Sequence, residues 1–445
     1  MRRVLVANRG EIALRIIRAC RELQIESIAV FSEADRDSLH VRYADRAVCV
    51  GPAPSAQSYL NMQNIIAAAE VHGADAIHPG YGYLSEQPLF AEMCEAYNLI
   101  FIGPSPEHIA LMGNKARAKA EMAKAGVPVL PGSDGPIESD AELVHTAEEL
   151  GYPVIIKAVA GGGGRGMRLA MNKDELLQQS QISRAEAAAA FGSDQIYLEK
   201  YLVNPRHIEV QIVADNFGNV VHMGERECSL QRRHQKLLEE CPSPAVDEEL
   251  RERLGAAAVQ AAKAIGYCNV GTVEFLLDTD GNFYFMEMNT RIQVEHPVTE
   301  MVYGIDLVKE QLRIAAGEPL GYDQSRIVPH GHAVECRILA EAVERDSRPS
   351  PGTITHLHIP GGFGVRWDSH VYQGCTIPPY YDSMFGKLIT WGADREEAVH
   401  RMERALGELV VEGIETSIPF HRRLIRDQRF RDGQFSTSFV DELLR

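Results

Sequence analysis

The first hundred positions alternate between short apolar runs and stretches in which apolar side chains recur every three or four residues. The runs predict buried strands at residues 4–7, 27–31, 74–77 and 99–102. The helical spacing predicts helices over residues 11–23, 61–72 and 89–97. This alternation of strands and helices is typical of a parallel, doubly wound sheet, whose ligands bind in loops that follow the strands.

The sequence after residue 150 predicts a second module built around a glycine-rich loop. A strand at 152–157 ends in Lys157, the loop occupies 161–166, and another strand follows at 168–170. A glycine hairpin between strands fits a cover over nucleotide phosphates, because backbone N–H groups can approach them closely. The loop lacks the strand-to-helix context of a dinucleotide fingerprint. A plain surface loop is the alternative.

The stretch from Glu274 to Glu295 carries the densest set of candidate catalytic side chains. Two strand-like runs flank Asp-Thr-Asp-Gly, which is a hairpin signal. If the second strand continues to residue 295, alternate side chains share one face opposite Glu274, namely Glu287, Asn289, Arg291, Gln293 and Glu295. Carboxylates and an amide oxygen suit Mg²⁺, the guanidinium suits a small anion, and Glu295 is a candidate base. The alternative is an edge hairpin with a solvated polar face.

Three further features point to bound anions or nucleotides. The basic run at 231–236 is unusual in this acidic chain and is best explained by an anion between it and the acidic hairpin. Arg337 interrupts an apolar strand, where a buried guanidinium needs an anionic partner. Glu199, in an extended segment at 195–202, can bind an adenine amine, although a surface Glu-Lys pair is the alternative.

The remaining patterns complete an α/β and α+β fold. A helical connector over 106–125 carries Lys115, and a helix is predicted over 174–191. The C-terminal part predicts strands at 354–358, 364–367 and 387–391, with helices over 396–408 and 418–427. We expect four parts, with boundaries at 1–114, 115–203, 204–330 and 331–445.

Composition narrows the class of protein. A formal net charge of −17 argues against binding to nucleic acid or to a membrane surface. The eight cysteines contain no Cys-x-x-Cys pair, which indicates neither a disulfide framework nor a zinc site. The N-terminus has no signal-peptide pattern, and no apolar run approaches the length of a membrane span. We therefore expect a cytoplasmic protein.

Taken together, these motifs resemble the ATP-grasp superfamily and, within it, the biotin carboxylase subunits of acetyl-CoA carboxylase. The motifs that carry the resemblance are Ala-Asn-Arg-Gly-Glu-Ile-Ala at 7–13, the Gly-rich segment 162–168, Arg-His-Gln-Lys at 233–236, the segment 287–297 and Pro-Tyr-Tyr-Asp-Ser at 379–383. The resemblance implies a Rossmann-like pre-ATP-grasp domain, an ATP-grasp lid and a C-terminal α+β domain. It also implies ATP-dependent carboxylation of biotin by bicarbonate through carboxyphosphate, in fatty acid synthesis.

The resemblance also implies roles for individual residues. Catalytic roles fall to Lys236, Arg291, Gln293, Val294, Glu295 and Arg337. ATP would contact Lys115, Lys157, Gly162, Gly163, Gly164, Gly166, Glu199, Lys200, Leu202, His207, Gln231, His234 and Leu276. Two Mg²⁺ or Mn²⁺ ions would bind Glu274, Glu287 and Asn289. Glu295 would take the proton of bicarbonate, and Arg337 would stabilise carboxyphosphate and the biotin enolate.

Partners follow from the same resemblance. The sequence holds no Met-Lys-Met motif for biotin attachment, so we expect biotin to arrive on a biotin carboxyl carrier protein and to pass to carboxyltransferase subunits. We expect a homodimer, with candidate interface residues Arg15, Arg18, Glu22, Phe363 and Arg366. The chain departs from common family patterns at Leu339, at 344–348 and at 436–438, which leaves nucleotide affinity and the partner open.

Four other functions compete with this hypothesis. One is the same subunit in another acyl-CoA, pyruvate or urea carboxylase, and another is a different ATP-grasp ligase. A nucleotide sensor without turnover is disfavoured by the intact set Lys236, Glu295 and Arg337. An NAD-dependent oxidoreductase is disfavoured because no Gly-x-Gly-x-x-Gly follows the first strand.

Overall fold

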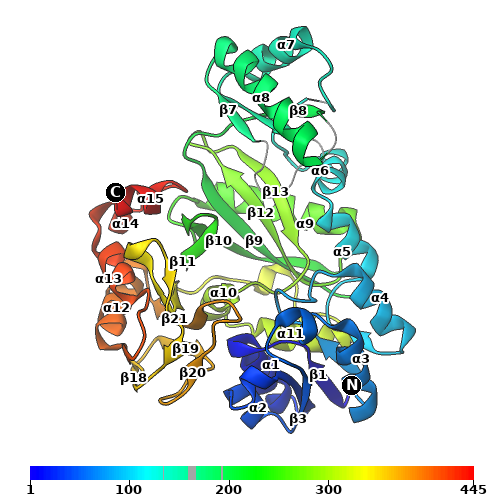
Figure 1. The fold of residues 1–445 in the computed structure, drawn as a ribbon, viewed down its shortest axis with the longest axis vertical. Helices are drawn as coiled ribbons and strands as arrows, with labels where there is room; N and C mark the ends of the chain where they lie inside the picture. The colour runs from blue at the N-terminus through cyan, green and yellow to red at the C-terminus, as the bar shows by residue number, and fades with distance from the viewer. Residues whose placement is uncertain (134, 159–166, 192–193) are drawn as a thin grey trace. The chain divides into compact units, whose positions relative to one another are not determined.

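The computed structural model describes residues 1–133, 135–158, 167–191 and 194–445 (Figure 1). The chain divides into two compact units, which are described separately. The larger unit contains Met1–Val127, Arg206–Leu276 and Glu287–Arg445. The smaller unit contains Pro128–Pro205 and Leu277–Met286. The four domain boundaries expected from the sequence stay a prediction.

The N-terminal part of the larger unit is the doubly wound sheet expected from the sequence. Its parallel strands have the order β3-β2-β1-β4-β5. Their bounds are β1 Arg3–Val6, β2 Glu26–Ser32, β3 Arg46–Gly51, β4 Ala76–His78 and β5 Ile100–Phe101. The helices are α1 Gly10–Glu22, α2 Leu39–Tyr43, α3 Met62–His72, α4 Pro88–Ala96, α5 Pro106–Gly113 and α6 Lys115–Lys124.

Local signals explain where these helices begin and end. The Asn61 side chain accepts a hydrogen bond from Asn64 N at the start of α3, and Gly73 ends that helix at φ +64° in the left-handed region. The connector expected as one helix is two helices, α5 and α6. The break falls at Asn114, whose side chain caps α6 by accepting from Arg117 N.

A larger sheet has the strand order β13-β12-β9-β10-β11-β14-β21-β19 (Figure 1). The strands are β9 Arg206–Ala214, β10 Val220–Arg232, β11 Gln235–Cys241, β12 Asn269–Leu277, β13 Phe283–Asn289, β14 His332–Leu339, β19 Val365–Ser369 and β21 Met384–Gly392. The helices between them are α9 Glu248–Ala264, α10 His296–Tyr303 and α11 Leu307–Ala315. Helix α10 contacts β11, β14 and β21.

The C-terminal part adds helices and short strands to the larger unit. The helices are α12 Arg395–Glu408, α13 Ile418–Arg426, α14 Gln428–Arg431 and α15 Phe439–Leu444. The short strands are β15 Glu341–Ala342, β16 Arg348–Pro349, β17 Gly352–Thr353, β18 His356–His358, β20 Thr376–Ile377 and β22 Val410–Glu412. They pair as β15-β16, β17-β20 and β18-β22.

The described residues of the smaller unit form a three-stranded antiparallel sheet and two helices. The strand order is β7-β6-β8, with β6 Val154–Ala158, β7 Arg168–Ala170 and β8 Ile196–Lys200. The helices are α7 Asp140–Leu150 and α8 Lys173–Phe191. Apolar residues of the sheet and the helices form one core, which includes Ile156, Leu176 and Leu198.

One expectation about the catalytic stretch is wrong. The strand that carries Glu287 ends at Asn289 and does not continue to residue 295. Glu86 from the N-terminal part accepts Thr290 N and pairs with Arg291, and the chain then enters α10 at His296. Pro297 in the first turn of α10 is a helix-start signal that the strand interpretation overlooked.

Candidate active site

A buried ammonium group lies at the centre of the candidate site. Lys236 on β11 lies 2.6 Å from Glu209, 3.3 Å from Glu274 and 2.6 Å from Glu295. Burial opposes its charge, but the three carboxylates outweigh burial and hold the pKa of Lys236 well above its ordinary value. Three strands and the start of α10 therefore meet around one fixed positive charge.

The carboxylate of Glu295 is held between two cations. One of its oxygens accepts from Lys236 Nζ, and the other accepts from Arg337 Nη2 at 2.9 Å. The side chain is 2% exposed. Burial raises the pKa of Glu295, but Lys236, Arg337 and Arg226 together hold it well below the ordinary value. The candidate base is thus an ionised, nearly water-free carboxylate.

The amide of Gln293 is oriented by two buried partners. Its Nε2 donates to Glu274 Oε1 at 2.8 Å, and its Oε1 accepts from Arg226 Nη2 at 2.6 Å. Arg226 on β10 is fully buried and also donates to Gln211 and Thr299. The amide of Gln293 therefore has a defined orientation beside Glu295.

Glu274 links the candidate metal and anion groups. Its Oε1 accepts from Asn289 Nδ2 at 2.7 Å, and its Oε2 lies 2.8 Å from His207 Nε2. Burial raises the pKa of Glu274, but Lys236 and His207 outweigh burial and hold it below the ordinary value. An ionised carboxylate with an adjacent amide oxygen is a donor set that suits Mg²⁺.

The second acidic candidate pairs with a lysine. Lys115, at the start of α6, lies 2.8 Å from Glu287 Oε2 on β13. Asn289, two residues further along the strand, accepts from Arg291 Nη2 at 2.8 Å. Each candidate metal carboxylate, Glu274 or Glu287, thus has a lysine beside it, and these donors fit a divalent ion that carries phosphate oxygens.

The remaining nucleotide candidates of the larger unit are His207, Gln231, His234 and Leu276, and of these His207 contacts Glu274. Gln231 Nε2 lies 2.6 Å from His207 Nδ1, so the two side chains share one polar contact. His234 is an exposed residue of the β10–β11 turn, with φ +66°. Leu276 is half-buried on β12, two residues after Glu274.

Four other nucleotide candidates belong to the smaller unit. Lys157 on β6 pairs with Glu199 on the neighbouring strand β8. Lys200 donates to Gly151 O at 2.7 Å, and its backbone N donates to Pro131 O at 2.9 Å. Leu202 follows β8 and is half-buried. The candidates Gly162, Gly163, Gly164 and Gly166 lie outside the described residues.

Several residues of the site were missed by the sequence interpretation. They are Glu86, Glu209, Arg226, Glu239 and Lys387. Lys387 carries the same signal as Arg337, a single cation in an apolar strand, and that signal was applied only to Arg337. Glu209 lies in the segment His207-Ile-Glu-Val-Gln211, whose polar residues alternate with apolar ones as in a strand with one polar face. The contact of Glu86 has no sequence signal, since it joins positions 205 residues apart.

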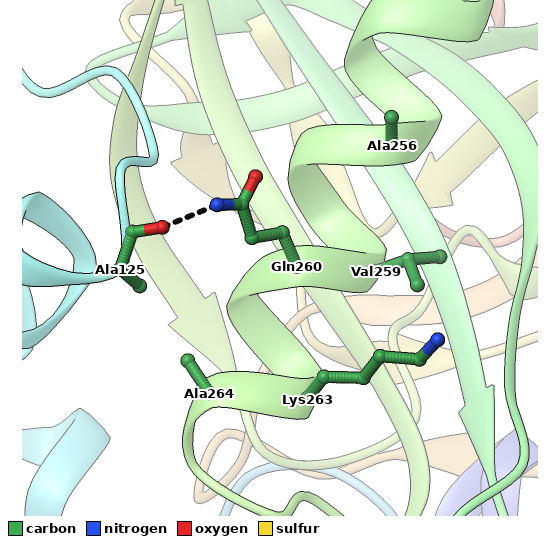
Figure 2. A pocket seen from close by; sticks show the side chains of 6 residues that line it. All are labelled: Ala125, Ala256, Val259, Gln260, Lys263 and Ala264. Carbon is green, nitrogen blue, oxygen red and sulfur yellow. Dashed lines mark hydrogen bonds between the residues drawn. The ribbon is translucent and has the colours of Figure 1, made fainter.

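A separate pocket lies against α9 and is not part of this cluster (Figure 2). Its lining consists of Ala125, Ala256, Val259, Gln260, Lys263 and Ala264. Gln260 donates to the Ala125 carbonyl at its side. Lys263 is the one charged residue of this lining, and no polar groups converge there as a substrate site requires.

Comparisons with known proteins agree along the whole chain. Residues 1–109 match the family model described as "Biotin carboxylase, N-terminal domain", and residues 335–442 match "Biotin carboxylase C-terminal domain". Residues 114–322 match "Carbamoyl-phosphate synthase L chain, ATP binding domain". These matches and the site place the chain in the class of ATP-dependent ligases with an ATP-grasp domain.

Similar proteins narrow the class further. The chain is 59% identical to a biotin carboxylase of Nostoc sp. over 441 residues, which cover 99% of each chain. It is 50% identical, with a TM-score of 0.92, to a biotin carboxylase–β,γ-ATP complex from Campylobacter jejuni, with coverage of 99% and 98%. It is 49% identical, with a TM-score of 0.90 and coverage of 100% and 98%, to the biotin carboxylase domain dimer of Hydrogenobacter thermophilus 2-oxoglutarate carboxylase with MgADP, ADP and bicarbonate.

The chain belongs to the biotin carboxylase family, whose members use ATP and bicarbonate to carboxylate biotin. This confirms the family, the fold class and the type of reaction predicted from the sequence. Within the described part of the chain, no helix combines the length and the apolar character needed to cross a membrane.

Proposed function

We propose that this chain activates bicarbonate with ATP and carboxylates the ureido nitrogen of biotin, with Glu295 as the base. The observation that carries the proposal is the Glu295 carboxylate between Lys236 and Arg337, ionised and 2% exposed. Phosphorylation of bicarbonate needs a carboxylate that accepts its proton beside cations that neutralise the developing charge. The larger unit holds both kinds of group within one hydrogen-bonded cluster.

Bicarbonate binds, in this proposal, beside Glu295. Lys236, Arg291, the amide of Gln293 and the backbone N–H of Val294 supply hydrogen-bond donors for its oxygens. Transfer of the bicarbonate proton to Glu295 makes the oxyanion that attacks the γ-phosphorus. The fixed orientation of the Gln293 amide by Arg226 and Glu274 supports this assignment, because a preorganised donor needs no rearrangement during the reaction.

The nucleotide and its metal ions occupy the remaining candidates. Glu274, Glu287 and Asn289 hold two Mg²⁺ or Mn²⁺ ions, which neutralise phosphate charge during transfer. Lys115, His207, Gln231, His234 and Leu276 contact ATP in this proposal, and the nucleotide contacts expected of Lys157, Glu199, Lys200 and Leu202 stay predictions. The phosphate contacts expected of Gly162, Gly163, Gly164 and Gly166 stay a prediction, because these residues lie outside the described part of the chain.

Biotin meets Arg337 in the second step. Carboxyphosphate breaks down to carbon dioxide and phosphate. The released phosphate takes the ureido N–H proton of biotin, and the resulting enolate captures the carbon dioxide. Arg337 stabilises the negative charge of carboxyphosphate and of the enolate, which suits a guanidinium in a buried site. We propose that biotin arrives on a separate carrier protein and that carboxyltransferase subunits pass its carboxyl group to acetyl-CoA. A different final acceptor of the carboxyl group is the alternative, because one similar structure belongs to a 2-oxoglutarate carboxylase.

We also propose that the chain forms a homodimer. Among the candidate interface residues, Phe363 is 79% exposed beside Arg401 and Trp391. Arg15, another candidate, is buried and pairs with Glu300 and Asp306 of its own chain. The relative from Hydrogenobacter thermophilus, described as a domain dimer, supports the proposal.

The test is phosphate release from ATP with Mg²⁺, with bicarbonate and free biotin added singly and together. Release that requires bicarbonate and rises with biotin is the expected result. Release indifferent to both would contradict the proposal and favour a different ATP-grasp ligase. Incorporation of labelled bicarbonate into acetyl-CoA or into a keto acid, with purified carrier and transferase subunits, decides the final acceptor.

A further inference from the structure

Residues 291–295 form a corner between β13 and α10, and a second buried lysine lies next to it. Lys387, in the middle of β21, is 0% exposed. Its Nζ donates to the backbone carbonyl of Val294 at 2.7 Å and lies 3.1 Å from Glu11 Oε1 on α1. Burial of an ammonium group costs free energy unless the group is paired. The contacts of Lys387 with Val294 and Glu11 therefore hold it at this position.

The contact with Val294 fixes one of two successive peptide groups. Because a peptide is planar, holding a carbonyl also holds the N–H of the next residue. The Val294 carbonyl, held by Lys387, belongs to the peptide that leads into Glu295. The preceding peptide, which carries the Val294 N–H, is held separately, because His296 Nδ1 lies 2.8 Å from the Gln293 carbonyl. Lys387 therefore acts on the orientation of Glu295 more than on the Val294 N–H.

Other groups keep the ammonium in place. Glu11 accepts from the hydroxyl of Tyr81, which lies in the loop after β4. Burial opposes the charge of Lys387, but Glu11, Glu335 and Asp368 outweigh burial and raise the pKa of Lys387 above its ordinary value. Lys387 thus stays charged at any pH at which the protein works.

We propose that Lys387 is a positioning residue of the carboxylation reaction, which holds the peptide before Glu295 so that this carboxylate faces bicarbonate. Lys387 touches no substrate and acts through Val294. The proposal rests on the proposed function, in which Glu295 is the base. It assigns a role in catalysis to a side chain of the C-terminal part that joins α1 and the loop after β4 to the catalytic corner.

Two variants test this role. Lys387→Met removes the donor and the charge at similar side-chain length, but it leaves Glu11 buried without its cation. The double variant Lys387→Met with Glu11→Gln removes both charges and keeps an acceptor for Tyr81. The matched control is Arg251→Met on α9, which breaks the contact of a cation with a buried carboxylate, Glu225, and with a backbone carbonyl, that of Val246.

Three measurements distinguish a role of Lys387 in positioning Glu295 from a role in stability alone. Hydrogen exchange of the segment 293–298 reports the corner directly, without turnover. The kcat and the KM for bicarbonate come from bicarbonate-dependent phosphate release. Binding of a non-hydrolysable ATP analogue with Mg²⁺ reports the nucleotide site.

Both Lys387 variants are expected to raise exchange of this segment at least tenfold and to lower kcat at least tenfold. The KM for bicarbonate and the affinity for the ATP analogue should change less than threefold, because the Val294 N–H is held by another residue. Arg251→Met should lower the melting temperature and leave these quantities unchanged.

Normal exchange or normal kcat in the folded double variant would overturn the proposal. A wild-type protein without bicarbonate-dependent turnover would refute the proposed function instead. In that case raised exchange in the variants would still show that Lys387 holds the corner in place, but Lys387 would have no role in this reaction.

Discussion

At the scale of single residues, charge compensation decides the chemistry of the site. Glu209, Glu274 and Glu295 surround Lys236, and Arg337 covers the second oxygen of Glu295. Glu274 and Glu295 therefore remain ionised although they are buried, which a metal ligand and a base both require. Removal of one member leaves an uncompensated charge on its neighbours.

The division of labour between Glu295 and Arg337 gives the first prediction. Arg337→Ala should lower biotin carboxylation on the order of a hundredfold, the usual effect of losing one donor to a developing oxyanion. It should lower bicarbonate-dependent ATP hydrolysis less, because Lys236 still contacts Glu295. Phosphate release without biotin gives the rate of bicarbonate-dependent ATP hydrolysis, and the increase on addition of biotin gives the rate of carboxylation. Equal losses would contradict the separate role of Arg337.

The metal assignment gives the second prediction. Glu274→Gln or Glu287→Gln should raise the Mg²⁺ concentration for half-maximal phosphate release by at least roughly tenfold. The physical reason is that an amide replaces a negative oxygen ligand of a hard cation. Asp278→Asn, in the turn between β12 and β13, is the control and should leave the Mg²⁺ dependence unchanged. An unchanged Mg²⁺ dependence in either variant would remove that residue from the metal site.

The side chains predicted from the sequence were those in patterns that local rules cover. Alternation along the strand singled out Glu274, Glu287 and Asn289, and a cation in an apolar strand singled out Arg337. Glu86 and Arg226 were not predicted. Their partners, Arg291 and Gln293, are distant in sequence and contact them only in the folded chain. Contacts of this kind depend on strand order, which periodicity does not encode.

At the scale of elements, the buried faces of β11 and β14 carry an acidic pair. Glu239 and Glu335 are direct partners in the antiparallel register, so their side chains share one face of the sheet. Glu239 accepts from Arg337 Nε at 2.6 Å. Burial raises the pKa of Glu239 to about 7 against the opposing effect of Arg337, and burial raises that of Glu335 well above its ordinary value.

This pair gives the third prediction. The pKa of Glu335 is higher in the folded chain than in the unfolded chain, so its contribution to stability is complete below the unfolded pKa and is lost as pH rises. Glu335→Gln resembles the protonated acid and does not titrate. The melting temperature of Glu335→Gln minus that of the wild type should therefore increase from pH 5 to pH 8, by on the order of 2 °C. A melting-temperature difference that is constant with pH, or that falls, would show that Glu335 is ionised in the fold.

The elements themselves were largely predictable, but the catalytic corner was not. Apolar periodicity located β1, β2, β4 and β5 of the doubly wound sheet. It missed β3, whose residues are mostly exposed or half-buried. The end of β13 at Asn289 depends on Glu86, which binds the chain just after the strand. Residues 291–295 consequently form a corner before α10, in which Gln293 bonds to Glu274 and Glu295 bonds to Lys236 without sharing a strand face.

At the scale of the whole molecule, dimerisation gives the fourth prediction. Light scattering should give the wild type about twice the chain mass of 49.3 kDa. Phe363→Glu should shift the mass toward the monomer, because it places a charge on an exposed aromatic residue at the candidate interface. Phe217→Glu, at another exposed aromatic residue, is the control. A wild type that remains a monomer at every concentration would refute the dimer.

The central claim is that bicarbonate attacks ATP with Glu295 as its base, and oxygen labelling tests the attack directly. With ¹⁸O-labelled bicarbonate and MgATP, the bond that forms joins a bicarbonate oxygen to the γ-phosphorus. Breakdown of carboxyphosphate then leaves that oxygen on phosphate. The predicted result is one ¹⁸O atom in each phosphate released by the wild type, with little release by Glu295→Gln. Phosphate without label, produced at a rate that bicarbonate does not change, would contradict the proposed mechanism.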